Sequence, residues 1–109
     1  GEVEGRNVII LDDEVATGGS ILELVRALRN ERAGRISLAC THGLFTGQAI
    51  ERLGSLDDLE EIVTTNTVPI AAEKRLPNMT VLSIAPLLAE AISRIHKGES
   101  VSALFVNSV

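Results

Sequence analysis

The chain has 109 residues, of which 45% are hydrophobic and 23% are charged, a balance typical of one soluble globular domain. Fifteen Asp and Glu against ten Lys and Arg give a net charge of −5, which disfavours nucleic acid and anionic membrane surfaces as partners. The one cysteine, Cys40, cannot form an internal disulfide, and no apolar run approaches the roughly 20 residues that span a membrane. These features predict a cytoplasmic protein.

The apolar pattern predicts strands that alternate with helices along the chain. A continuous apolar run at residues 8–11 is typical of a strand buried on both faces. The elements that follow are a helix over 20–33, a strand over 35–41, a helix over 49–53, strands over 61–65 and 80–84, and a last helix from Pro86. This order predicts an α/β fold in which helices cover both faces of a parallel sheet. No linker or repeat divides residues 1–109, so we expect one domain.

Two of the predicted helices have a clear apolar face. In the first helix this face consists of Ile21, Leu24, Val25 and Leu28. Ser20 and Glu23 have the spacing of a capping box, which predicts that Ser20 caps the start of this helix. In the last helix the apolar face consists of Leu87, Leu88, Ala91, Ile92 and Ile95.

The segment 8–20 gives the strongest functional signal. It combines a strand, the carboxylates Asp12 and Asp13, a loop of small residues and a helix start. Gly18 and Gly19 allow backbone N–H groups to approach an anion, and the helix adds its positive end, so the segment predicts a monophosphate cradle. The two carboxylates can accept hydrogen bonds from a vicinal diol or order water around Mg²⁺. Together these features predict a ribose 5-phosphate site.

The same segment allows other interpretations. Gly-Gly-Ser before a helix is often only a turn and an N-cap. A nucleotide-binding P-loop is excluded because its Lys is absent. A phosphoacceptor receiver domain also begins with a strand that ends in acidic residues, but it needs an acceptor Asp and a Lys at the ends of later strands. Asp57 and Asp58 precede the third strand instead, and no Lys ends a strand.

Two further side chains lie near the predicted ligand edge of the sheet. His42 ends a strand there, and a single His in this position is more often structural than functional. Cys40 lies inside an apolar strand, where we expect a small buried side chain.

The segment 8–20 resembles the phosphoribosyl diphosphate loop of type I phosphoribosyltransferases. Four further segments narrow the resemblance to the family of ribose-phosphate pyrophosphokinases: 39–47, 63–69, 84–92 and 98–105. The resemblance implies a Rossmann-like three-layer sandwich, incomplete at its N-terminus, in a fragment of a Mg²⁺-dependent enzyme. The family enzyme transfers diphosphate from ATP to the C1 hydroxyl of ribose 5-phosphate.

The resemblance also implies roles for individual residues. Asp12 and Asp13 would hold the ribose hydroxyls, and the 5-phosphate would be wrapped by Ala16, Thr17, Gly18, Gly19 and Ser20. A regulatory nucleotide or phosphate site between subunits would include Ser100, Val101, Ser102 and Phe105. One departure is Ala16, where many family members carry an acid.

Several parts of the family enzyme have no counterpart in this sequence. They are the ATP-binding domain with its metal-binding His, the mobile loop with Lys and Arg, and the diphosphate-binding loop. The sequence begins at Gly1 and its one Met is Met79, so we expect a fragment whose catalytic residues lie upstream of Gly1. The resemblance therefore implies a C-terminal portion of the catalytic domain, inactive alone, with ATP bound by the missing parts.

The resemblance also suggests a homo-oligomer, with dimers assembled into a hexamer. The alternative to an enzyme fragment is a non-catalytic relative that keeps the fold to regulate the true enzyme. A mobile loop with Lys and Arg in the sequence before Gly1 would indicate the enzyme, and its absence would indicate the regulator.

Overall fold

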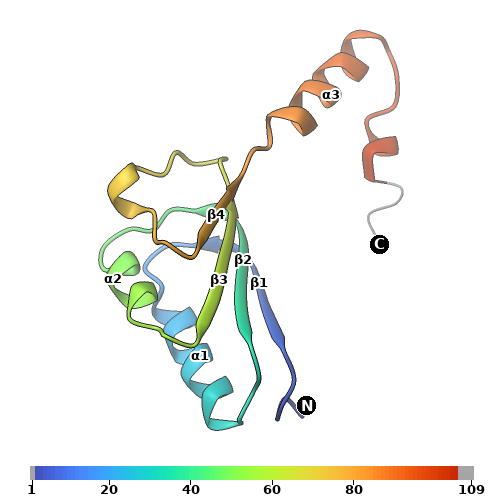
Figure 1. The fold of residues 1–109 in the computed structure, drawn as a ribbon. Coiled ribbons are helices and arrows are strands. Elements are labelled where there is room, and N and C mark those ends of the chain that lie inside the picture. Colours follow the sequence, from blue (N-terminus) through green and yellow to red (C-terminus); the bar gives the residue numbers. More distant parts are fainter. Residues whose placement is uncertain (1, 106–109) are drawn as a thin grey trace.

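The computed structural model describes residues 2–105 and contains alternating strands and helices (Figure 1). The elements are β1 (Val8–Val15), α1 (Gly19–Asn30), β2 (Ile36–Gly43), α2 (Ala49–Gly54), β3 (Leu59–Thr65), the 3₁₀ turn η1 (Ala72–Lys74), β4 (Met79–Leu82), α3 (Ala85–His96) and the 3₁₀ turn η2 (Ser102–Phe105). Every strand and α-helix predicted from the sequence is present. Within the described part of the chain, no helix is both long and apolar enough to cross a membrane.

Gly1 lies outside the described residues. The expectation that the catalytic residues of the enzyme precede Gly1 concerns chain beyond this sequence, and residues 2–105 do not test it. It therefore stays a prediction of the family resemblance, as does the assignment of residues 1–109 to the C-terminal part of a catalytic domain.

The four strands form one parallel sheet in the order β1-β2-β3-β4. This confirms the predicted α/β class. Because the order is consecutive and the crossovers of parallel strands are right-handed, α1 and α2 fall on the same face of the sheet, as Figure 1 shows. A second helical layer needs a strand order that reverses. Residues 2–105 contain no such reversal, so the prediction of helices on both faces is not met within them.

The hydrophobic core lies between this sheet and the two helices. Alternate strand residues point toward the helices, and the buried members of the core include Ile10, Leu38 and Ile62 from the strands, Ile21 and Val25 from α1, and Ala49 and Leu53 from α2. Phe45, in the connection from β2 to α2, is also fully buried. The apolar positions of the sequence therefore place α1 and α2 against the sheet.

The opposite face of β1 is open. Ile9 is 72% exposed and Leu11 is 82% exposed, so the prediction of a strand buried on both faces is wrong for this chain. Within this apolar run, Ile10 faces α1, while Ile9 and Leu11 face the uncovered side of the sheet.

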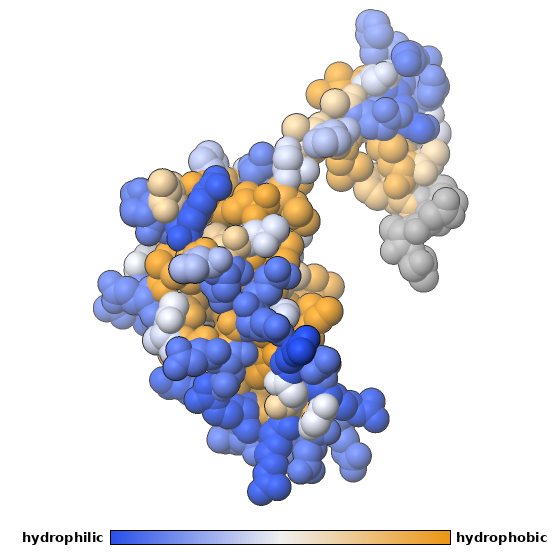
Figure 2. Space-filling view, in the orientation of Figure 1, coloured by the Kyte–Doolittle hydropathy of each residue, from blue (hydrophilic) through white to orange (hydrophobic). Residues whose placement is uncertain are grey.

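Helix α3 forms where the sequence predicts it but packs against neither face. It projects away from the sheet (Figure 1), and none of its residues is buried. Its hydrophobic side chains are visible on the surface in Figure 2, and the exposed large ones are Leu87, Leu88, Ile92 and Ile95. The predicted helix is therefore confirmed, although its apolar face is not buried within residues 2–105.

Cys40 is buried in the core, as predicted. Its Sγ lies 3.4 Å from Thr64 Oγ1, to which it donates a hydrogen bond. Burial raises the pKa of the Cys40 thiol, and the nearby Asp12 carboxylate adds to this effect, while a hydrogen bond that the Thr64 hydroxyl can donate to the thiolate opposes it. Cys40 is thus a structural thiol that stays protonated near neutral pH.

The raised thiol pKa predicts a pH-dependent stability. Above the unfolded pKa of about 8.5, the unfolded chain loses the thiol proton before the folded chain does, so the free energy of unfolding falls as the pH rises. We expect the free energy of unfolding in urea of the wild type, minus that of Cys40→Ala, to show this fall above about pH 8.5. A difference that stays flat or increases over this range would contradict the burial of an ionisable thiol here.

Gly43 at the end of β2 provides a test of the packing around Phe45. A Cβ on Gly43 would lie within 2.7 Å of Phe45 Cζ and 3.0 Å of Thr64 Oγ1. We expect Gly43→Ala to lower the free energy of unfolding by about 1 to 3 kcal/mol, because the buried ring must move. The matched control is Gly19→Ala, where the nearest atom is 3.8 Å away. Equal stability of the two variants in chemical denaturation would contradict this packing.

Candidate functional site

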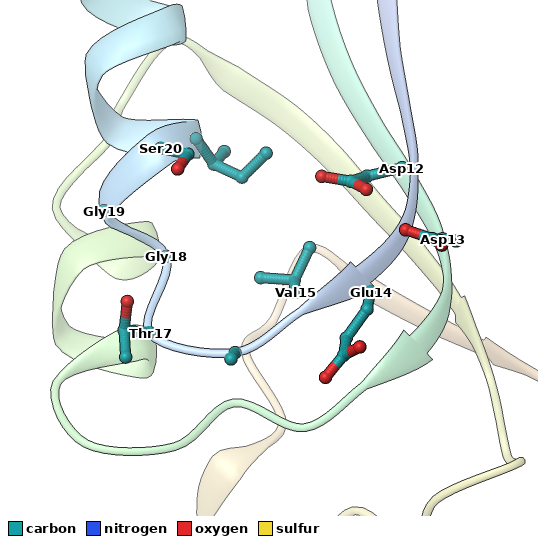
Figure 3. Close-up of a pocket in the computed structure, with 10 residues that line it drawn as sticks. Asp12, Asp13, Glu14, Val15, Thr17, Gly18, Gly19 and Ser20 are labelled. Carbon is teal, nitrogen blue, oxygen red and sulfur yellow. The ribbon is translucent and has the colours of Figure 1, made fainter.

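A cavity of about 330 Å³ lies at the carboxyl end of β1 and is lined by residues 12–21 (Figure 3). All seven residues predicted to bind the sugar phosphate are among its lining residues: Asp12, Asp13, Ala16, Thr17, Gly18, Gly19 and Ser20. The sequence reasoning therefore identified one continuous concave site, formed by the end of the strand, the loop and the first turn of α1.

The carbonyl groups of the loop are held from outside the cavity. Val15 O accepts hydrogen bonds from the N–H groups of Leu44 at 3.0 Å and Phe45 at 3.2 Å, and Ala16 O accepts one from Thr46 N at 2.9 Å. The next carbonyl, Thr17 O, accepts one from a side chain of α2 at 2.8 Å. These three carbonyls are thus directed toward α2 and the segment that connects it with β2.

The orientation of these carbonyls fixes the orientation of the loop N–H groups. In a trans peptide the C=O and the following N–H point in opposite directions. The N–H groups of Ala16, Thr17 and Gly18 therefore point away from the connection between β2 and α2. Within residues 2–105 they donate no hydrogen bond, which leaves them available to an anion in the cavity.

The start of α1 adds further donors. Gly18 is the N-cap, with a left-handed φ of 77°, and the first helical bond runs from Leu22 N to Gly18 O at 2.9 Å. The N–H groups of Gly19, Ser20 and Ile21 have no acceptor among the described residues, as expected for the first turn of a helix. Together with the helix dipole they favour an anion at this point.

The predicted capping box does not form. The helix begins at Gly19, so Ser20 lies inside its first turn and not at the N-cap, and no side chain of the described residues caps the helix. The physical reason is that Gly18 adopts the left-handed conformation without steric cost and takes the N-cap position two residues earlier than the sequence pattern indicates. The Ser20 and Glu23 side chains therefore do not compete with a ligand for the helix donors.

Three carboxylates lie beside the N–H groups. Figure 3 shows that Asp12 extends from β1 into the space facing Ser20, and Asp13, the next residue of the strand, also lines the cavity. Glu14 also lines the cavity, which the sequence reasoning did not assign to the site. One end of the cavity thus carries hydrogen-bond donors and the other carries acceptors.

The described residues do not form a metal cage. Among residues 2–105 no group of three or more His, Cys, Asp or Glu side chains is placed to hold a metal ion. Protein sites for Mg²⁺ commonly use one or two carboxylates and complete the coordination with water and substrate phosphates. Asp12 and Asp13 fit that kind of partial site.

His42 lies at the same edge of the sheet but does not line the cavity. Its Nδ1 is 2.7 Å from Thr67 Oγ1, and that hydroxyl donates to Thr41 O at 3.2 Å. The hydrogen bonds connect β2 to the loop after β3, in agreement with a structural role.

The residues predicted to form a regulatory site follow α3, away from the cavity (Figure 1). Ser100 Oγ and Ser102 Oγ lie 2.7 Å apart, and Arg94 Nη1 donates to Ser100 O at 3.3 Å. Val101 O accepts from Leu104 N at 3.0 Å, which begins the turn that ends at Phe105. The turn brings these residues together, and their binding of a regulator stays a prediction.

Comparison with known proteins extends over nearly the whole chain. Residues 1–106 match the family described as "Phosphoribosyl synthetase-associated domain". The chain is 56% identical to a putative ribose-phosphate pyrophosphokinase of Streptomyces coelicolor and 48% identical to a ribose-phosphate pyrophosphokinase of Rhodopirellula baltica, over 105 residues in both cases. These matches cover 96% of this chain and 33% of each relative.

A solved structure supports the same assignment. The crystal structure of phosphoribosylpyrophosphate synthetase from Mycobacterium smegmatis matches with a TM-score of 0.87 and 42% sequence identity. The match covers 90% of this chain and 33% of that one, so the chain spans about a third of the proteins it matches. The chain belongs to the phosphoribosyl synthetase-associated domain family, and its relatives are ribose-phosphate pyrophosphokinases.

Proposed function

We propose that this chain is the part of a ribose-phosphate pyrophosphokinase that binds ribose 5-phosphate. The observation that carries the proposal is the row of unpaired N–H groups from Ala16 to Ile21, next to the carboxylates of Asp12 and Asp13 in one cavity of the described residues. A phosphate needs several donors, whereas a ribose diol needs acceptors. The cavity offers both within one continuous segment of the chain.

The phosphate would bind at the start of α1. Backbone donors and the helix dipole supply its recognition, so no Lys or Arg is needed inside the cavity. Gly18 and Gly19 keep the loop free of Cβ atoms where it meets the anion. Ala16 contributes its N–H group and a methyl group, and the absence of an acid at this position removes one negative charge beside the phosphate.

The ribose would bind at the end of β1. Each ionised carboxylate can accept from one or two hydroxyl groups, so Asp12 and Asp13 together can hold a vicinal diol and orient C1. When bound, Mg²⁺ would neutralise charge on the reacting phosphates. Asp12 and Asp13 are the residues that would hold its water ligands.

The reaction is a transfer of diphosphate. The C1 hydroxyl oxygen of ribose 5-phosphate forms a bond to the β-phosphorus of ATP and gives up its proton to water. The bond from that phosphorus to the oxygen that bridges to the α-phosphorus breaks, and AMP leaves with that oxygen. Such transfers depend mainly on positioning and charge neutralisation. This chain would position the sugar, and ATP would bind to other parts of the protein. A homo-oligomer and a cytoplasmic location stay predictions of the sequence and the family resemblance.

A second candidate function is regulation without catalysis. It is favoured by Ala16, which stands where many members of the resembled family carry an acid. A regulatory relative would retain the fold and the phosphate cradle but would not form AMP. The two functions are therefore distinguished by whether the full-length protein converts ATP to AMP when ribose 5-phosphate is added.

The proposal predicts the kinetics of variants at the two strand-end carboxylates. In the full-length protein that contains this chain, we expect Asp12→Asn and Asp13→Asn to raise the KM for ribose 5-phosphate. The rise should be about ten- to a hundred-fold, because a hydrogen bond to a charged group contributes about 1.5 to 3 kcal/mol. The KM for ATP should change little. AMP formation that depends on ribose 5-phosphate is the measurement.

Asp57→Asn is the matched control, because Asp57 is an exposed carboxylate that precedes β3, at the opposite end of the strands from the cavity. We expect it to behave as the wild type. Kinetics unchanged in both Asp12 and Asp13 variants would exclude the diol clamp. A full-length protein that binds ribose 5-phosphate but forms no AMP would favour the regulatory function.

A further inference from the structure

Arg52 connects α2 to the loop between β1 and α1, which carries the N–H groups proposed to bind phosphate. Its Nη1 donates to Thr17 O at 2.8 Å, across 35 positions of the sequence. The same nitrogen lies close to Gly19, since a Cβ on that glycine would be 3.8 Å from it. Arg52 is nevertheless absent from the residues that line the cavity. It therefore contacts the loop from the outer side.

The rest of α2 holds Arg52 in this position. Ala49, one helical turn earlier, is fully buried, and a Cβ on Gly18 would lie 3.6 Å from its Cα. Residues three apart share a face of a helix, so Ala49 and Arg52 both meet the loop, one through packing and the other through a hydrogen bond. Leu53 is buried in the core and fixes the rotation of α2.

Among residues 2–105, no acid neutralises the guanidinium of Arg52. The salt bridges of the described residues involve Arg29, Arg32, Arg35 and Arg94. Within residues 2–105 no carboxylate is paired with Arg52, so its positive charge remains behind the loop, where it favours an anion on the other side.

We propose that Arg52 is a positioning residue for the phosphate end of the site. By holding Thr17 O on the outer side of the loop, Arg52 turns the N–H of Gly18 toward the cavity. It thus presets the donors that bind the phosphate of the sugar. This role rests on the proposed function, because it presupposes that ribose 5-phosphate occupies the cavity. The sequence reasoning did not predict a role for Arg52. The only indication in the sequence is that Arg52 lies three residues after Ala49, which places both on one face of the helix.

The test compares KM values in the full-length protein that contains this chain. We expect Arg52→Ala to raise the KM for ribose 5-phosphate about tenfold, while the KM for ATP and the thermal midpoint stay near the wild-type values. Arg52→Lys keeps the charge and one donor, and should give an intermediate KM. Arg26→Ala is the matched control, because Arg26 is an exposed arginine of α1 that does not line the cavity. It should leave both KM values unchanged.

Chemical rescue provides a readout that a purely structural role would not give. Guanidinium ion at low millimolar concentration should restore part of the ribose 5-phosphate affinity of Arg52→Ala and should not affect Arg26→Ala. If Arg52→Ala fails to fold, Arg52→Lys is judged by the same selective rise in KM. An unchanged KM for ribose 5-phosphate, or an equal rise for ATP, would overturn the positioning role. A wild-type protein that binds no ribose 5-phosphate would overturn the proposed function itself.

Discussion

The site depends on three successive carbonyl groups that are all bound from one side. Val15 O, Ala16 O and Thr17 O accept hydrogen bonds from the connection between β2 and α2 and from α2 itself. A loop of Ala, Thr and Gly has no large side chain of its own with which to fix its backbone. Its conformation is therefore set by its neighbours, and the N–H groups that face the cavity are oriented by contacts made outside it.

Local pattern predicted the elements of the fold but not what covers them. The apolar periodicity placed β1 and α1 within a few residues, although β1 continues to Val15 because β2 pairs with it that far. Ile9, Ile10 and Leu11 are all apolar, yet only Ile10 meets a helix of the same chain. The apolar face of α3 is equally evident in the sequence, while its partner is not. The apolar periodicity indicates which face of a strand or helix is suited to burial. The topology of the fold determines which element, if any, covers that face.

The same holds for the candidate site: the local sequence predicted where the cavity lies, but not the contacts made by residues distant in the sequence. The row of small residues between a strand and a helix was sufficient to locate the cavity. Its details depended on Gly18, which takes the N-cap in a left-handed conformation and moves Ser20 into the helix. Arg52 lies beyond a strand and a connection, and no rule of spacing along the chain relates it to Thr17.

This arrangement would suit the transfer of diphosphate that we propose for the protein containing this chain. When little covalent chemistry is assigned to side chains, the rate depends on how well the reactants are held. Donors that belong to the backbone cannot rotate as side chains do, so a phosphate bound to them loses less freedom on the protein side than one bound to a long cationic side chain. The cost is that the backbone must be fixed in advance. In this chain the short helix α2 meets that requirement, with Ala49 packed against Gly18 and Arg52 bound to Thr17 O.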